Sequence, residues 1–486
     1  MSCLATPLRF LRLSPAELNL ATAVKSGQSF RWILQSPVVA TQPDHRLAAS
    51  ASTVPVAAEG VEEWAFPWQD RTVVMRQDDQ GLYYRSLYPF APPHSAFLAD
   101  LASDTTLAFI RRYFQLDVPI VPLYEQWAAQ DPKMKKKVES AGEALRGIRV
   151  LAQDEWETLV SFICSANNNI SRITLMVNRL CAARGSPLPH PSHFTPACVH
   201  AEAFTVPKSV LPQPNDLSLF SFPPPSTLTD STTETLLRQL GFGYRASFIP
   251  FSAAHLLSVS AASSQSPDQY LRSLRREAVL ATGKGIADAR EKLLEFKGVG
   301  RKVADCVLLF GLGWAETVPV DTHVFHIAIR DYGFPATRTT SLTPALHDRV
   351  AEHLSSRWGN YAGWCQQVLF FAELKPSSPT KKSETSASIK FFSKIELAEE
   401  ETVEGEEQKR KLTFEEEVAA LIADPGKKRS RRSVVQVKET RKIEVKEEAE
   451  ESALSSPLSS PEPDTNKAKA KGGQRRAGRG RRVKVE

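Results

Sequence analysis

The stretch KGVGRKVADC, residues 297–306, decides the fold because it places a glycine-rich joint between two helical patterns. The segments before and after it, ADAREKLLEF and RKVADCVLLFGL, both show apolar residues at helical spacing. Gly298 and Gly300 can take backbone angles that a Cβ forbids, which predicts a tight helix-to-helix turn. No third glycine, preceding strand or GK[ST] motif is present, which excludes a dinucleotide fingerprint and a P-loop. The sequence therefore predicts a helix-hairpin-helix.

The predicted hairpin has two interpretations. The exposed amides at the start of the second helix can hold a DNA phosphate, because helix N-termini favour anions. The same turn also occurs as a plain connection between two antiparallel helices in a bundle. The glycines alone leave both interpretations open.

Asp321 lies at the next predicted helix start. We expect Gly311 and Gly313 to end the second hairpin helix and Pro319 to stiffen the approach to Asp321. Aspartate is a good N-cap, and capping alone accounts for a carboxylate at this position. However, Asp321 also lies 19 residues after Lys302, which fits a loop that returns the chain from one helix start to the next. An amine and a carboxylate brought together would suit attack on an electrophilic sugar carbon.

Composition divides the chain into three parts. Residues 1–123 contain strand-like runs such as SFRWIL, RTVVMRQ and GLYYRSLY, which predict an α+β domain. Residues 124–375 show helical periodicity, interrupted by a Pro/Ser-rich insert that we expect to be a loop. Residues 376–486 contain no Trp, Tyr, Cys or Met, and their alternating charged and Ser/Pro segments predict disorder. The fold class is therefore α+β followed by an all-helical domain and a disordered tail.

The charge of the chain is concentrated in its last part. The formal net charge is +6, and residues 376–486 hold 25 Lys and Arg against 21 Asp and Glu. The cluster GKKRSRR and the final basic stretch, residues 467–484, predict nuclear import or a nucleic-acid-binding tail, although a solvated linker would have similar charge. Arg9 and Arg12 precede the first acidic residue, which leaves mitochondrial import open as a second destination.

Cysteine spacing and hydropathy exclude several classes. None of the six cysteines forms a CxxC pair, which argues against a zinc ribbon and a thioredoxin-type site. We therefore expect reduced thiols and no metal site built from side chains. No run of 18 apolar residues occurs, so we expect no membrane partner.

Five stretches together carry a family resemblance. LLEFKGVGRKVADC with VPVDTHVFHI resembles the helix-hairpin-helix, Gly/Pro-rich loop and Asp motif of base-excision DNA glycosylases. SGQSFRW, FICSANNNISRI, LGFGYRA and GWCQQVLFFAEL narrow the resemblance to eukaryotic 8-oxoguanine DNA glycosylase/AP lyases. The iron–sulfur loop of endonuclease III-type relatives is not expected, because no cysteine follows Cys365. The resemblance implies a TBP-like N-terminal antiparallel sheet with helices, and it covers the chain up to residue 374.

The resemblance assigns catalytic roles to two residues. Lys302 is expected to attack C1′, expel the base and form a Schiff base that permits β-elimination. Its pKa is ordinarily about 10.4, so we expect burial or cationic neighbours to favour the neutral amine. Asp321 is expected to stabilise the positive charge that develops on the sugar.

The resemblance also implies residues that bind the flipped base and the DNA. Each has a structural alternative, such as a core cysteine or phenylalanine, a strand-entry glycine or a surface histidine. The residues expected at the base are Gly27, Cys306, Gln366 and Phe370, and His323 is expected on the phosphate side of the flipped nucleotide. Those expected at the DNA are Asn167, Arg172, Tyr244, Arg245, Gly298 and Gly300. Gly27 would offer its carbonyl to the N7 hydrogen that 8-oxoguanine has and guanine lacks.

The implied activity is excision of 8-oxoguanine opposite cytosine from double-stranded DNA, followed by strand nicking through β-elimination. We expect a monomer that needs no cofactor. Two alternatives remain: a helix-hairpin-helix glycosylase for another lesion, and a non-catalytic module that only holds phosphates. Lys302 disfavours a purely hydrolytic enzyme, because hydrolysis needs no amine, and Lys302 with Asp321 disfavours the module.

Overall fold

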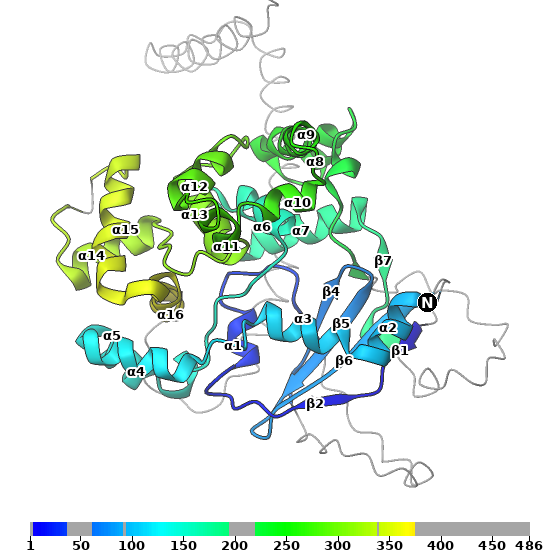
Figure 1. Ribbon diagram of the computed structural model, residues 1–486, viewed down its shortest axis with the longest axis horizontal. Helices are drawn as coiled ribbons and strands as arrows, with labels where there is room; N and C mark the ends of the chain where they lie inside the picture. The colour runs from blue at the N-terminus through cyan, green and yellow to red at the C-terminus, as the bar shows by residue number, and fades with distance from the viewer. Residues whose placement is uncertain (1–2, 36–60, 91–93, 194–218, 338–339, 375–486) are drawn as a thin grey trace, which may run out of the picture. The chain divides into compact units, whose positions relative to one another are not determined.

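The structure, a computed structural model, describes residues 3–35, 61–90, 94–193, 219–337 and 340–374 (Figure 1). The predicted disordered tail and both of its basic clusters lie outside these residues. So does most of the Pro/Ser-rich insert.

An antiparallel sheet forms the N-terminal part. Its strand order is β1-β6-β5-β4-β3, and β2 also pairs with β6. The strands are β1 (Cys3–Ala5), β2 (Arg9–Leu11), β3 (Ile33–Gln35), β4 (Glu63–Trp68), β5 (Arg71–Gln77) and β6 (Leu82–Pro89). The runs RTVVMRQ and GLYYRSLY are thus confirmed as strands, whereas only the end of SFRWIL is one.

The sheet buries both of its faces because apolar residues occupy successive positions of its central strands, and successive side chains point to opposite faces. Val73 and Met75 of β5 point into a core that includes Phe109, while Val74 packs with Leu87 on the other face. The covering helices are α1 (Leu20–Val24), α2 (Ser95–Ser103) and α3 (Thr105–Tyr113), and Figure 1 shows α3 lying across the sheet.

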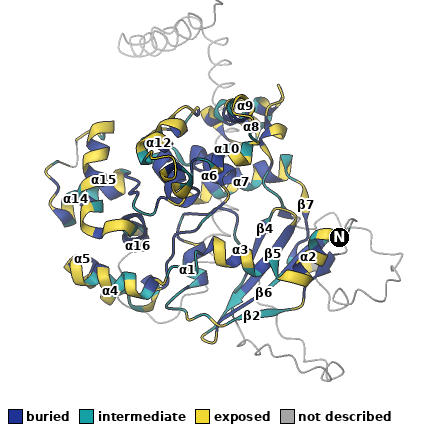
Figure 2. Cartoon of the chain, viewed as in Figure 1, coloured by how far each residue is buried: buried dark blue, intermediate teal, exposed yellow. Residues whose placement is uncertain are grey.

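The rest of the described chain is helical. Before the insert lie α4 (Ile120–Gln130), α5 (Pro132–Ala141), α6 (Glu155–Ser165) and α7 (Ile170–Arg184). After it lie α8 (Thr233–Gln239), η6 (Gly243–Ser247), α9 (Phe248–Ala262), α10 (Pro267–Arg272), α11 (Arg276–Leu280), α12 (Ile286–Leu294), α13 (Arg301–Phe310), α14 (Thr322–Tyr332), α15 (Pro344–Trp358) and α16 (Ala362–Leu374). Helix α6 is buried from Glu155 to Cys164, which places it at the centre of this part (Figure 2).

A buried arginine joins the segment that follows α1 to helix α6. Arg31 Nη1 donates to Glu157 Oε2 of α6 at 2.6 Å, and both side chains are buried. Removing one partner of such a pair costs about 3–5 kcal/mol, because the other charge is left uncompensated. This pair therefore fixes the Ser26–Trp32 stretch of sequence against α6.

The predicted loop of the insert is partly regular in the described residues. Its two ends, β7 (Pro187–Leu188) and β8 (Leu219–Phe220), pair as a short antiparallel ribbon. Cys164, Cys181, Cys306 and Cys365 are buried and free, as expected for reduced thiols. Every helix in the described ranges is too short or too polar to cross a membrane.

The predicted fold class is confirmed: an antiparallel sheet with helices precedes a helical domain that contains the hairpin. The described residues belong to one compact unit within residues 1–377. The division at residues 123 and 124 stays a prediction.

Candidate active site

The predicted hairpin joins α12 to α13. Gly298 has a φ of +83°, and a Cβ there would lie 2.4 Å from Cδ2 of Phe248. Only glycine fits such a position, because both the backbone angle and the neighbouring ring exclude a side chain. The Oγ of Ser252 donates to the Lys297 carbonyl at 3.2 Å and holds the turn on α9.

Gly300 differs from the prediction. Its φ of −93° is open to any residue, and nothing lies within 4 Å of the position of a Cβ. The expectation that its backbone needs glycine is therefore wrong. The N-cap of α13 is instead left open to the approach of another molecule, at a helix end that favours anions.

The return loop brings Asp321 to the start of α14. Helix α13 ends at Phe310 with Gly311 as its C-cap, as predicted. Asp321 is the N-cap of α14, and its Oδ1 accepts the Val324 amide at 2.9 Å. Only one carboxylate oxygen is used, so capping leaves the other oxygen available to the site.

Lys302 lies in the first turn of α13 and is half-buried. Its ammonium lies 5.3 Å from the ring centroid of Phe162, a buried residue of α6. It interacts electrostatically with Cys306, one turn along the same helix, and with Asp321. The structure thus brings together the predicted nucleophile, carboxylate and pocket thiol.

The charge state of Lys302 differs from the expectation. Burial opposes the ammonium, but Cys306 and Asp321 outweigh burial, so the pKa of Lys302 is raised. Burial also raises the pKa of Cys306 to about 11, so its thiol is uncharged at neutral pH. Asp321 is then the carboxylate that favours the ammonium, besides the contribution of Cys306. The prediction that the surroundings favour a neutral amine is wrong for the DNA-free protein, because the charged neighbour is an anion.

A second group of predicted residues surrounds Gly27. Gly27 has a φ of +77°, and a Cβ there would lie 4.0 Å from Cε1 of Phe370. The ring centroids of His323 and Phe370 are 6.3 Å apart. Gln366 is buried on α16, one turn before Phe370. Among the described residues, no hydrogen bond, ion pair or ring contact joins this group to Lys302.

A third group gathers most of the residues predicted to contact DNA. The loop from α6 to α7 turns at Asn167, whose φ of +50° is one that asparagine tolerates. The carbonyl of Ala166 in that loop accepts hydrogen bonds from Tyr244 Oη, at 3.1 Å, and from the Arg245 guanidinium. Arg172 Nη2 donates to Gly241 of the same surface at 3.4 Å.

Tyr244 and Arg245 are placed differently within this group. Tyr244 is 51% exposed, which suits contact with DNA, whereas Arg245 is 2% exposed. The Arg245 guanidinium also donates to the Asn167 carbonyl at 3.1 Å. In the DNA-free protein, Arg245 therefore holds the loop that presents Asn167.

A buried polar group connects the elements that carry Lys302 and Asp321. Asp305, next to Cys306, accepts from Arg290 Nε at 2.7 Å. His347 of α15 lies 3.6 Å from the other Asp305 oxygen, and its Nε2 accepts the Val320 amide at 3.3 Å. Because Val320 precedes Asp321, His347 connects the helix that carries Lys302 to the loop that carries Asp321.

The pKa of His347 is lowered to about 4, chiefly by burial, with further lowering by Arg301 and Arg290 against the opposite effects of Asp348 and Asp321. Its contact with Asp305 is therefore not an ion pair at neutral pH. Burial also raises the pKa of Asp305 to about 6.

His347→Asn is expected to be less stable than the wild type at pH 7. The difference in stability between the two proteins should shrink as the pH falls. The unfolded state binds a proton near pH 6.5 and the folded state only near pH 4, so His347 destabilises the wild type as the pH falls through this window. Over this window, the difference in free energy of unfolding between the wild type and the variant should change by on the order of 3 kcal/mol. Thermal melts of both proteins from pH 7.5 to 4.5 measure it, and a constant difference across that range would contradict this role of His347.

Three contacts of the site were not predicted from the sequence. Phe162 lies under the Lys302 ammonium, Ile170 lies against Gly27, and Gln367 bonds to the Ser26 carbonyl. Phe162 and Ile170 are within FICSANNNISRI, but helical spacing does not distinguish them from core residues. The sequence did contain a signal for Gln367. CQQ places two glutamines on an otherwise apolar helix, and a buried amide needs a hydrogen-bond partner.

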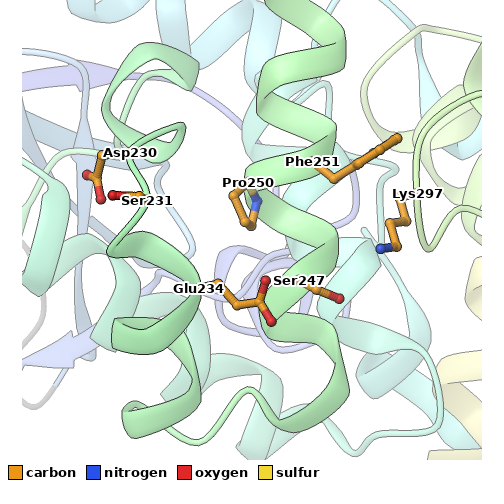
Figure 3. A pocket seen from close by; sticks show the side chains of 7 residues that line it. All are labelled: Asp230, Ser231, Glu234, Ser247, Pro250, Phe251 and Lys297. Carbon is orange, nitrogen blue, oxygen red and sulfur yellow. The ribbon is translucent and has the colours of Figure 1, made fainter. Parts of the chain in front are cut away.

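A surface pocket lies beside the hairpin, outside the three groups (Figure 3). Its lining residues are Asp230, Ser231, Glu234, Ser247, Pro250, Phe251 and Lys297. The Lys297 ammonium lies 5.3 Å from the ring centroid of Phe251. Asp230 and Glu234 already pair with Arg184 and Arg238. The pocket is therefore a hollow between α8 and α9 that shares only Lys297 with the hairpin turn.

Comparisons with known proteins agree with the family that the sequence resembles. Residues 10–159 match the 8-oxoguanine DNA glycosylase N-terminal domain, and residues 160–353 match the HhH-GPD superfamily of base excision DNA repair proteins. The N-glycosylase/DNA lyase of Saccharomyces cerevisiae is 33% identical over 83% of this chain and 95% of its own length. The N-glycosylase/DNA lyase OGG1 of Arabidopsis thaliana is 30% identical over 79% and 87%.

The fold also resembles a solved structure. The DNA-free 8-oxoguanine glycosylase/lyase of Clostridium acetobutylicum is 20% identical, with a TM-score of 0.51 over 76% of this chain and 99% of that one. At this identity the likeness supports the fold alone.

The hairpin, its lysine and the capping aspartate of the next helix define a base-excision DNA repair protein of the HhH-GPD superfamily. More narrowly, the chain belongs to the 8-oxoguanine DNA glycosylase family, whose yeast and Arabidopsis members are N-glycosylase/DNA lyases. It is a DNA glycosylase with DNA lyase activity.

Proposed function

We propose that this enzyme removes 8-oxoguanine paired with cytosine from double-stranded DNA and then nicks the strand by β-elimination. The observation that carries the proposal is the partly buried group of Lys302, Cys306 and Asp321 beside the hairpin. A nucleotide flipped from the duplex would place its C1′ at the Lys302 amine while the hairpin amides hold the backbone.

The reaction follows from these residues. The ammonium of Lys302 first loses a proton, and the neutral amine then attacks C1′ as the N-glycosidic bond breaks and the base leaves. Asp321 stabilises the positive charge that develops on the sugar, because a carboxylate in an enclosed site interacts strongly with a nearby cation. The substitution leaves a closed-ring glycosylamine and a base that takes up a proton. The nitrogen then loses a proton while the C1′–O4′ bond opens and O4′ is protonated, which gives the imine. The imine acidifies the C2′ hydrogens, and removal of one of them forms the C2′–C3′ double bond and expels the 3′ phosphate.

Recognition of the lesion rests on the second group of residues. The Gly27 carbonyl would accept the N7 hydrogen of 8-oxoguanine, Phe370 would stack on the base, and Gln366 would bond to its Watson–Crick edge. Asn167 and Arg172 would read the cytosine left in the partner strand, beside Tyr244.

Duplexes that contain 8-oxoguanine, an alkyl-adenine or thymine glycol test the substrate, each with borohydride trapping of the imine. We expect a trapped adduct and a nick only with 8-oxoguanine, and faster reaction opposite cytosine than opposite adenine. Preference for another lesion would assign a different substrate. Binding with a steep salt dependence but no lesion preference would indicate a module that only holds phosphates.

We further propose that the enzyme acts as a monomer in the nucleus. The basic clusters of residues 426–432 and 467–484 support nuclear import through their charge. Deleting residues 376–486 from a fluorescently tagged chain should abolish nuclear accumulation without loss of excision in vitro. Sedimentation with and without DNA tests the monomer.

A further inference from the structure

The turn at Gly27 is held from both sides by buried side-chain amides of distant elements. Gln367 Nε2 of α16 donates to the Ser26 carbonyl at 2.7 Å, and Gln153 Nε2 donates to the Gln28 carbonyl at 2.8 Å. Both glutamines are at most 5% exposed. The carbonyls on either side of Gly27 are therefore fixed in direction.

The Gln28 side chain closes the same turn from inside. Its Nε2 donates to Ser26 Oγ and to the Arg149 carbonyl, both at 2.7 Å, and its Oε1 accepts the Leu151 amide at 2.9 Å. Among the described residues, no donor bonds to the Gly27 carbonyl. The carbonyls of Ser26 and Gln28 thus already accept hydrogen bonds, whereas the Gly27 carbonyl is available to a ligand.

Helix α16 contacts this turn at two points. One is the hydrogen bond from Gln367, and the other is the Phe370 ring beside Gly27. Gln366 and Gln367 point about 100° apart, because successive residues of a helix rotate by that angle. One glutamine can therefore hold the turn while its neighbour faces the base.

We infer that Gln367 is a positioning residue for lesion specificity: it sets the Gly27 carbonyl at a fixed distance from the base-binding side chains of α16. The inference rests on the proposed function and extends it. The ligand is an oxidised purine that carries hydrogen on N7. A carbonyl aimed at N7 attracts that hydrogen and repels the lone pair of an undamaged guanine, and both effects depend on a hydrogen-bond distance.

Gln367→Met keeps the length of the side chain and removes its donor. We expect kcat/KM for 8-oxoguanine:cytosine duplex to fall about tenfold, which is what the loss of one buried hydrogen bond corresponds to. Cleavage of a preformed abasic-site duplex should stay within twofold of wild type, because no base is read. In a Lys302→Gln background, Gln367→Met should also reduce the ratio of 8-oxoguanine:cytosine to guanine:cytosine binding.

Thr72→Val is the matched control. Thr72 Oγ1 donates to the Pro189 carbonyl at 2.7 Å, so this variant loses a buried bond of the same kind and length in the sheet domain. It should lose stability without changing the ratio of excision to abasic cleavage.

The inference is overturned if Gln367→Met excises 8-oxoguanine at the wild-type rate, or if it loses excision and abasic cleavage in equal measure. Failure of the proposed function is a separate result. In that case, wild type itself cleaves abasic sites but does not excise 8-oxoguanine.

Discussion

Replacing Lys302 by glutamine is expected to give a protein that binds an 8-oxoguanine:cytosine duplex but neither releases the base nor forms a borohydride-trappable adduct. Glutamine has no nucleophilic amine, so both the glycosidic cleavage and the imine disappear together. The loss in rate should be at least about a thousandfold, as for the removal of other catalytic nucleophiles.

Binding should survive because Lys302 is not part of the surface that contacts the backbone. The hairpin turn depends on Gly298 and Phe248. The residues expected to contact the partner strand are held by hydrogen bonds to the Ala166 carbonyl. The glutamine side chain can still lie over Phe162. Gel-shift and trapping assays on the same preparations separate the two steps. A trapped adduct in Lys302→Gln would show that another residue is the nucleophile.

The charge state of Lys302 adds a pH dependence to this prediction. Since the pKa of Lys302 is raised, its amine is almost wholly protonated at neutral pH. The single-turnover rate of the wild type should rise between pH 6 and 8 as the neutral fraction grows. A rate that is constant over this range would mean that proton loss from Lys302 does not limit the reaction.

The features that were predictable from the sequence are local ones. The turn at Gly298 and the cap at Asp321 each depend on a few neighbouring residues, so GVG and PVDT were sufficient to place them. The runs RTVVMRQ and GLYYRSLY were recognisable as strands from their short length and strand-like composition.

The features that were not predictable join distant parts of the chain. Gln367 and Ser26 are 341 positions apart, and Arg245 and Ala166 are 79 apart. No local pattern shows which carbonyl a buried amide or guanidinium will find. The pKa of Lys302 depends similarly on which charges pack beside it, and the prediction of a neutral amine gave too little weight to the carboxylate of Asp321.

Asp321→Asn is expected to fold with almost unchanged stability and to lose activity by about 10²–10⁴, the range seen when a charge or donor at a reacting centre is removed. Asparagine can still accept the Val324 amide through its side-chain oxygen, so the cap of α14 remains. Only the negative charge is lost.

Asp321→Ala separates the two roles of the carboxylate. It should lose the same activity and also about 1 kcal/mol of stability, because alanine cannot cap. Thr343→Ala is the control: Thr343 caps α15 by accepting the Leu346 amide at 3.3 Å, away from Lys302. This variant should lose comparable stability and retain its rate. Equal rates for wild type and Asp321→Asn would limit Asp321 to capping.

The pH profile of Asp321→Asn then identifies what the charge does. Asp321 raises the pKa of Lys302, so its removal leaves more neutral amine at pH 7 and by itself should speed the attack. Stabilisation of the sugar cation acts in the opposite direction, because its loss slows bond breaking. A profile that shifts to lower pH while the maximal rate falls would show that both effects operate and that the second is larger. A fall in rate without a shift would mean that the ammonium is held by Cys306 rather than by Asp321.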